Sequence, residues 1–158
     1  MPIRRMRNQD QFPLNSDRIR IEILSGLTVA LALVPEAVAF ARRPGTFALE
    51  LDCATGRVAA RLESPPGRHF CGHGTFSRDG GLLYTAENAY DLGEGRIGVW
   101  DAAAGYRRAG EFASGGIGPH DVQRLPGSEV LVVANGGIDT HPDTGRQKLN
   151  LATMRPNL

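Results

Sequence analysis

The side chains best suited to chemistry in this sequence are histidines, together with one glutamate at the end of a predicted strand. We take His73, His120, His141 and Glu87 as the candidate ligands of a divalent metal ion. Imidazole nitrogens and a carboxylate oxygen are donors that borderline metals such as zinc accept. The same residue types also hydrogen-bond to turn backbones and hold neighbouring strands together. The sequence leaves open a metal or small-ligand site and a purely structural role, and it indicates no other cofactor.

Motifs for catalysis or phosphate binding are absent from the sequence. Glycine pairs at Gly115–Gly116 and Gly136–Gly137 follow predicted strands but open no helix, so neither makes a phosphate-binding loop. No serine lies in the strained turn that a nucleophilic serine needs. The two cysteines, Cys53 and Cys71, have neither CxxC nor zinc-finger spacing. We therefore predict that the chain is not an enzyme.

An internal repeat relates the positions of two of the candidate ligands. His73 and His120 are 47 residues apart, as are Gly80 and Gly127, and as are Asn88 and Asn135. Each histidine precedes a turn and a second β-rich segment. Periods of roughly 40 to 50 residues with several short strands are typical of β-propeller blades. The repeat therefore places the two histidines at equivalent positions of successive blades, near the central channel.

The predicted fold class is all-β, a partial β-propeller preceded by one hydrophobic helix. Eight strands are expected, which at four per blade make two blades. An incomplete propeller leaves blade faces and edges open to water, so we expect self-association or dependence on a partner. The predicted strands are Thr46–Leu51, Arg57–Glu63, Gly72–Ser77, Leu82–Glu87, Arg96–Asp101, Tyr106–Phe112, Pro119–Arg124 and Glu129–Ala134.

The N-terminal part differs from the repeat region, and we divide the chain into residues 1–41 and 42–158. A polar, arginine-rich leader is followed by an apolar run, Ile23–Ala41, which predicts a helix. Three interpretations are open: a membrane-spanning helix, a signal peptide cleaved after Ala41, or a helix packed beside the sheets.

Residues 20–41 resemble the first transmembrane helix of SulP-type inorganic anion transporters. The specific part is Pro35-Glu36-Ala37-Val38-Ala39-Phe40. The resemblance implies that Glu36 and Phe40 border a sulfate or other anion site. It stops near Ala41, and a lone helix cannot form a path across a bilayer, so a transporter fragment is only an alternative.

Residues 43–158 resemble a different family, uncharacterised exported bacterial proteins predicted to be seven-bladed propellers with WD40-like and YncE-like repeats. The resemblance rests on clusters that occur in order. These are Arg68–Ser77, Leu83–Asn88, Gly95–Asp101, Gly118–His120, Val133–Ile138 and Thr140–Arg146. It implies a domain of unknown function that is exported to the periplasm or anchored to the membrane. Together the two resemblances suggest a chimera or a truncated product joined near Ala41.

The charge composition gives no indication of a nucleic-acid partner. The net charge is +1 and 22% of the residues are charged, so no basic surface favours nucleic acid. The leading functional hypothesis is a propeller-type binding or scaffold module of an exported protein. The alternatives are an anion-transporter fragment in the membrane and a periplasmic protein that binds a metal or small ligand.

Overall fold

The computed structural model describes residues 28–33 and 36–158. In these residues the chain is all-β, with ten strands and two short 3-10 helices. Their bounds are β1 (Thr28–Leu33), β2 (Glu36–Phe40), β3 (Phe47–Asp52), β4 (Arg57–Glu63), β5 (Arg68–Phe76), β6 (Leu82–Ala89), β7 (Glu94–Asp101), β8 (Arg107–Ala113), β9 (Pro119–Arg124), β10 (Leu131–Asn135), η1 (Pro142–Thr144) and η2 (Leu151–Thr153).

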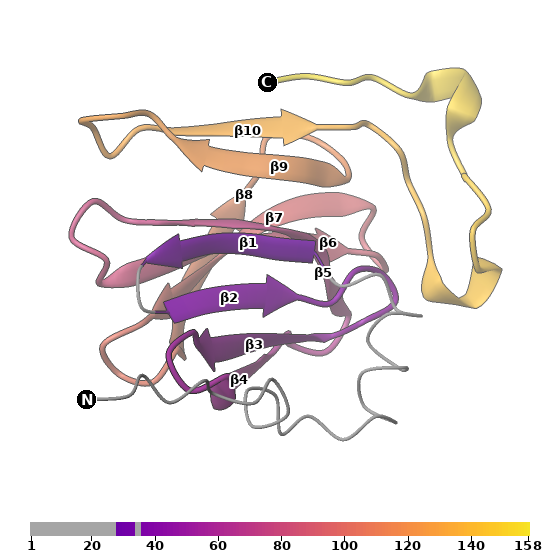
Figure 1. Cartoon of the computed structure of the whole chain (residues 1–158). Helices are drawn as coiled ribbons and strands as arrows, with labels where there is room; N and C mark the ends of the chain where they lie inside the picture. The colour runs from indigo at the N-terminus through magenta and orange to yellow at the C-terminus, as the bar shows by residue number, and fades with distance from the viewer. Residues whose placement is uncertain (1–27, 34–35) are drawn as a thin grey trace, which may run out of the picture.

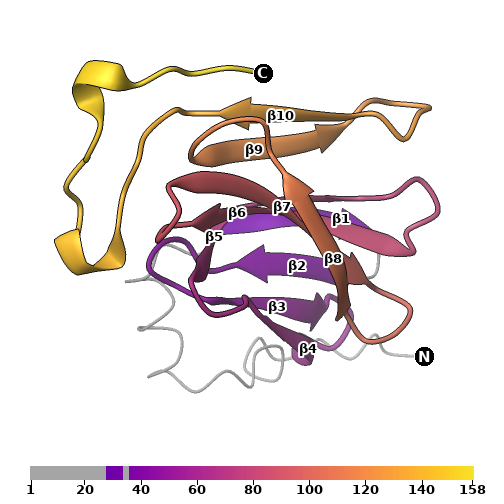
Figure 2. The same ribbon diagram turned by 180° about the vertical axis from the view of Figure 1, so that it is seen from behind.

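The strands form three antiparallel sheets. Sheet A has the order β1-β2-β3-β4, sheet B the order β5-β6-β7-β8, and sheet C consists of β9 and β10. Figure 1 and the reverse view in Figure 2 both place sheet C at the top of the molecule and β4 at the bottom. Strand β5 contacts β1 on one side and β9 on the other. We call β1, β5 and β9 the inner strands, because each is the first strand of its sheet and they lie next to one another.

The helix predicted over residues 23–41 is wrong for the part that the structure describes, because residues 28–33 and 36–40 are strands. Residues 23–27 and 34–35 lie outside the described residues. Strand β2 is buried from Ala37 to Phe40 without alternation. A strand covered on both faces shows no period of two, so its apolar run looks like part of a buried helix. No helix in the described part of the chain is long and apolar enough to cross a membrane.

All eight strands predicted between residues 46 and 134 are present, but their grouping differs from the prediction. Strands β3 and β4 complete a sheet with β1 and β2. Register pairs such as Phe40 with Ala48 join β2 directly to β3. The eight predicted strands therefore fall into parts of three sheets and not into two blades.

Sheets A and B enclose the larger core. Phe40 and Phe70 are fully buried, with ring centroids 5.6 Å apart, and Phe70 lies 6.0 Å from the Trp100 ring. Burying each large apolar side chain stabilises the fold by about 2 kcal/mol. Gly74 makes this packing possible, since a Cβ there would lie 2.8 Å from Cζ of Phe40 and 2.8 Å from the carbonyl oxygen of Tyr84.

Sheets B and C enclose a smaller core. Its buried members are Ala86 and Ile97 of sheet B and Val122 of sheet C. Half-buried side chains, including Cys71 and Leu131, surround them. Fewer and smaller side chains are buried here, so sheet C is held less firmly by apolar packing than sheet A.

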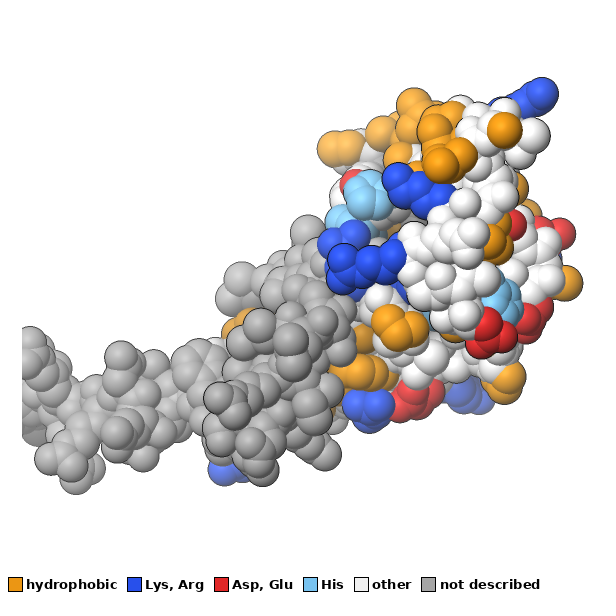
Figure 3. All heavy atoms as spheres, turned by 90° about the vertical axis from the view of Figure 1, so that its right-hand side faces the viewer, with side chains coloured by type: hydrophobic (Ala, Val, Ile, Leu, Met, Phe, Trp, Pro, Cys, Tyr) orange, Lys and Arg blue, Asp and Glu red, His pale blue; other side chains and the backbone are white. Residues whose placement is uncertain are grey.

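The segment after β10 runs along the side of the sheets and returns beside β10 (Figure 1). Asn157 and Asn135 form an isolated antiparallel bridge at its end. The side chain of Asn150 holds the middle of the segment by donating to the carbonyl of Gly137 and accepting from the amide of Asp139. Hydrophobic side chains gather at the top of the face seen in Figure 3.

Candidate ligand-binding site at the inner strands

Both histidines of the repeat lie where an inner strand bulges. In β5 the register shifts between Phe70 and Gly74, so that residues 71–73 face fewer residues of β6. In β9, Asp121 pairs with Ala134 and Pro119 with Asn135, which leaves His120 without a partner in the ladder. A bulge bends its strand and re-aims side chains, and bulges are common beside functional sites. Gly72 has φ +99°, a value that favours glycine at this point of the bulge.

The bulges bring His73 and His120 side by side. Their ring centroids are 5.2 Å apart and their planes meet at 51°. Nδ1 of His73 lies 3.5 Å from Oδ1 of Asp121. That carboxylate oxygen also accepts a hydrogen bond of 3.1 Å from Nε2 of Gln123. Two imidazoles and one oriented carboxylate therefore converge at the bulges of two adjacent inner strands.

The surroundings of His73 favour its neutral form. Partial burial lowers the pKa of His73 below its ordinary value of 6.5, the carboxylate of Asp121 opposes this effect, and His120 and Arg42 reinforce it. A neutral imidazole has one ring nitrogen that donates and one that can accept or ligate.

The nearby thiol is unreactive. Burial raises the pKa of Cys71 to about 12, and the negative charge of Glu87 contributes to the rise. A cysteine attacks as the thiolate, so a thiol that stays protonated is a poor nucleophile. Cys71 and Cys53 are both free.

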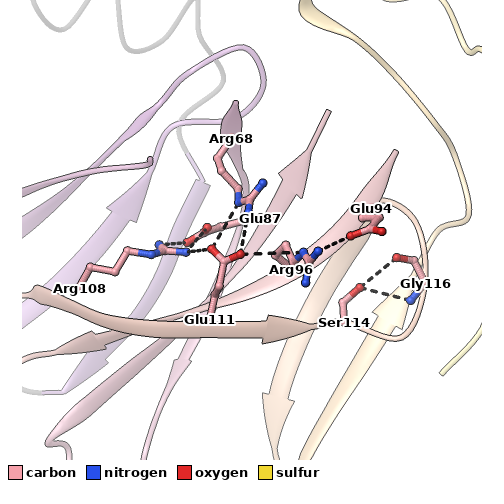
Figure 4. A network of polar contacts seen from close by, with 8 residues as sticks. All are labelled: Arg68, Glu87, Glu94, Arg96, Arg108, Glu111, Ser114 and Gly116. Carbon is pink, nitrogen blue, oxygen red and sulfur yellow. Dashed lines mark hydrogen bonds and ion pairs between the residues drawn. The ribbon is translucent and has the colours of Figure 1, made fainter. Parts of the chain in front are cut away.

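The loop before β9 is fixed by polar contacts. Oγ of Ser114 donates to Oδ1 of Asn135 at 2.6 Å, and Nδ2 of Asn135 donates to the carbonyl of Ser114 at 3.1 Å. Ser114 also contacts both backbone groups of Gly116 (Figure 4). Asn135, one of the two asparagines of the repeat, therefore holds the entry to the strand that carries His120.

Glu87 is fully buried and bonded within sheet B. Its two carboxylate oxygens accept hydrogen bonds of 2.8 and 2.9 Å from the guanidinium of Arg108 (Figure 4). The hydroxyl of Thr85 also donates to Oε1 of Glu87, at 2.6 Å. A buried carboxylate is stable only when it is paired and hydrogen-bonded in this way. These contacts occupy Glu87, and the structure does not bring it together with the histidine pair as a metal ligand.

The ion pairs continue outward from Arg108. Glu111 accepts from Arg108 at 2.8 Å and from Arg68 at 2.6 Å. Hydrogen bonding from Arg68 lowers the pKa of Glu111, with burial opposing it and Arg108 adding to it. Arg96 links Glu111 to Glu94 at the end of the network (Figure 4). The network joins β5, β6, β7 and β8 and is a structural feature of sheet B.

His141 lies in a different group of residues. Its Nδ1 accepts from the amide of Asp143 and so caps η1, while its Nε2 lies 3.1 Å from Oδ1 of Asp91. The ring meets Tyr90 edge-on, at 5.2 Å between centroids, and Tyr90 stacks on His69 at 5.8 Å. These contacts attach the segment after β10 to the turn between β6 and β7.

Of the four candidate metal ligands, the structure therefore brings only His73 and His120 together. Among residues 28–33 and 36–158 there is no group of three or more His, Cys, Asp or Glu side chains that could hold a metal ion. The sequence did not predict Asp121 as a residue of this site, although it follows His120 directly in the chain.

The two residues singled out by the transporter resemblance are in strand β2. Glu36 is exposed at the start of the strand. Phe40 is fully buried against Phe70 and belongs to the core between sheets A and B. The described residues place no site next to Phe40.

Comparison with known proteins gives one family. The model of a protein family of unknown function, DUF1513, matches residues 28–158. This range spans the position near Ala41 where the sequence suggested a junction. No curated protein matches the chain. Because the match covers well over half of the sequence, the chain belongs to the DUF1513 family.

Proposed function

We propose that the chain is a propeller-type binding module without catalytic activity, and that it binds its ligand at the inner-strand site around His73 and His120. The observation that carries the proposal is the convergence of two bulged inner strands on this histidine pair. Equivalent residues of successive repeats meet there, as the inner strands of neighbouring blades do around the axis of a propeller.

The arrangement of the sheets supports the propeller type. Sheets A and B are each four-stranded antiparallel sheets in which every strand pairs with its neighbour in sequence. Sheet C begins in the same way with β9 and β10. The first strand of sheet B contacts the first strands of sheets A and C. Radial stacking of such units around an axis is the geometry of propeller blades.

The chemistry of the site supports binding over catalysis. Cys71 stays protonated at neutral pH, and Asp121 is engaged with Gln123 and His73. A binding site needs a small number of placed polar groups beside an apolar surface. The histidine pair supplies the polar groups, and half-buried Cys71, two residues before His73 in β5, packs against the core of sheets B and C. We also propose that the protein is exported to the periplasm, because residues 43–158 resemble exported proteins.

Ligand-observed NMR with a library of small polar molecules tests the proposal on the full chain. We expect ligands that bind the native protein and do not bind the His120→Ala variant. Because His120 is exposed, we expect this variant to fold like the native protein. Phe112→Ala is the matched control, since Phe112 is an exposed aromatic residue on β8. Ligands that bind both variants equally well, or a library without any ligand, would contradict the proposal.

A further inference from the structure

We propose that His73 and His120 form a two-imidazole site for a divalent transition-metal ion, with Cu²⁺ and Zn²⁺ as the best candidates. The inference rests on the proposed function, because it names the ligand of the same inner-strand site. Its basis is the geometry of the histidine pair and of the carboxylate behind it.

The separation of the rings fits a shared ion. A zinc–nitrogen bond of about 2.0 Å places the ion about 3.2 Å from the centroid of each imidazole ring. Two such rings at a tetrahedral angle have centroids about 5.2 Å apart. The observed separation between His73 and His120 is 5.2 Å. The separation of the rings therefore matches that of two imidazoles bound to one ion.

Asp121 occupies the place of an orienting carboxylate. Histidines that bind metals usually donate the N–H of the other ring nitrogen to a carboxylate, which fixes the tautomer and strengthens the ligand. Nδ1 of His73 faces Asp121 at 3.5 Å, which leaves Nε2 as the ligating atom. Gln123 holds the carboxylate from the same strand. Asp121 is thus a positioning residue and His73 the ligand.

No third protein ligand is present among the described residues, so water or an added ligand would complete the coordination. Two imidazoles alone bind in the order Cu²⁺ above Zn²⁺.

Isothermal titration of the tag-free full chain with CuCl₂ and ZnCl₂ tests the inference. The chain carries Cys53→Ser, because that exposed thiol is a competing ligand. We expect one ion per chain and tighter binding of Cu²⁺. Affinity should fall at least about tenfold in His73→Ala and in His120→Ala, and about 10- to 100-fold in Asp121→Asn. His141→Ala is the matched control and should bind like the parent chain.

Circular dichroism spectra and melting temperatures of the variants confirm that they fold. His120→Ala is the decisive variant, because His120 is exposed and forms no hydrogen bond or ion pair with another side chain among the described residues. The inference is overturned if the parent chain binds neither ion, or if His120→Ala binds as tightly as the parent. It is also overturned if His141→Ala loses the ion equally. Small-molecule binding that depends on His120 without any metal binding would reject this inference and leave the proposed function standing.

Discussion

The two faces of sheet B differ in what they bury and in what they leave accessible. The face toward sheet A packs large rings, with Phe70 between Phe40 and Trp100. The face toward sheet C buries only Ala86 and Ile97 against Val122. The first interface carries most of the apolar stabilisation. The second has the polar side chains of His73, His120 and Asp121 beside it.

The polar contacts of sheet B also differ between its two faces. Toward sheet A, the buried carboxylate of Glu87 is closed off by Arg108. Toward sheet C, polar groups bridge the two sheets near the surface. Arg124 donates to the carbonyl of Phe76 at 3.1 Å, and the amide of Arg78 donates to Glu129 at 3.2 Å. The face of sheet B toward sheet A therefore holds the larger apolar core and a closed ion pair, and the face toward sheet C carries the bulges with His73 and His120.

The largest expected effect is on the free energy of unfolding when the apolar core of sheets A and B is opened. Phe70→Ala should lower it by about 4 kcal/mol, because the lost ring leaves a cavity beside Phe40 and Trp100. Val122→Ala should cost only about 2 kcal/mol at the other interface. Urea unfolding of both variants measures the difference. Equal losses would mean that the two interfaces are equally important.

A somewhat smaller effect is expected from breaking the buried ion pair. Arg108→Met should lower the free energy of unfolding by about 3 kcal/mol, because the Glu87 carboxylate loses its partner in a buried position. The double variant Glu87→Gln/Arg108→Met should recover most of that loss, since no uncompensated charge remains. Urea unfolding of the single and double variants measures these free energies of unfolding. A double variant as unstable as Arg108→Met would show that the charge is not the cause.

Gly98→Ala should have the next largest effect. A Cβ at Gly98 would collide with the Glu87 carboxylate and approach Oγ1 of Thr85 to 2.6 Å. We expect a cost of about 2 kcal/mol, as for other overpacked positions. Gly110→Ala is the matched control, because Gly110 lies in the neighbouring strand and a Cβ added there would meet no atom within 4 Å. Thermal unfolding distinguishes the two, and an equal change in melting temperature would contradict the packing at Gly98.

The smallest expected effect is on the titration of His73. Burial lowers its folded pKa below 6.5, so the unfolded chain takes up the proton first as the pH falls. The contribution of His73 to stability is therefore complete above about pH 6.5 and decreases as the pH falls toward the folded pKa. Asp121→Asn should lower this pKa further, because the carboxylate raises it. NMR titration of the imidazole protons measures both values. A rise in the pKa of His73 on this substitution would contradict the contact.

Much of the fold could be predicted from the sequence, because alternating strands and glycine turns are local signals. The exception is β1 and β2, whose apolar run forms two strands because β1 pairs with β2 and β2 pairs with β3. Such pairing is a tertiary effect that no local pattern reveals. The family match over residues 28–158 then places these strands with the rest of the chain.

The candidate site could be predicted only in part. The repeat relates His73 to His120, and these two side chains do meet. The roles of Glu87 and His141 depend on partners far away in the sequence, Arg108 and Asp91. Arg108 reaches Glu87 through the register of β7 and β8, and the amino-acid sequence contains no signal for that register.

The proximity of His73 and His120 tests most directly whether sheets B and C stack with their inner strands side by side, on which the proposed site depends. The chain has four histidines, so labelling with ¹³C-histidine gives a spectrum simple enough to assign by single substitutions. We predict a nuclear Overhauser cross-peak between the ring protons of His73 and His120, whose ring centroids are 5.2 Å apart. Folded protein that gives no such cross-peak would contradict the stacking of the two sheets and, with it, the inner-strand site.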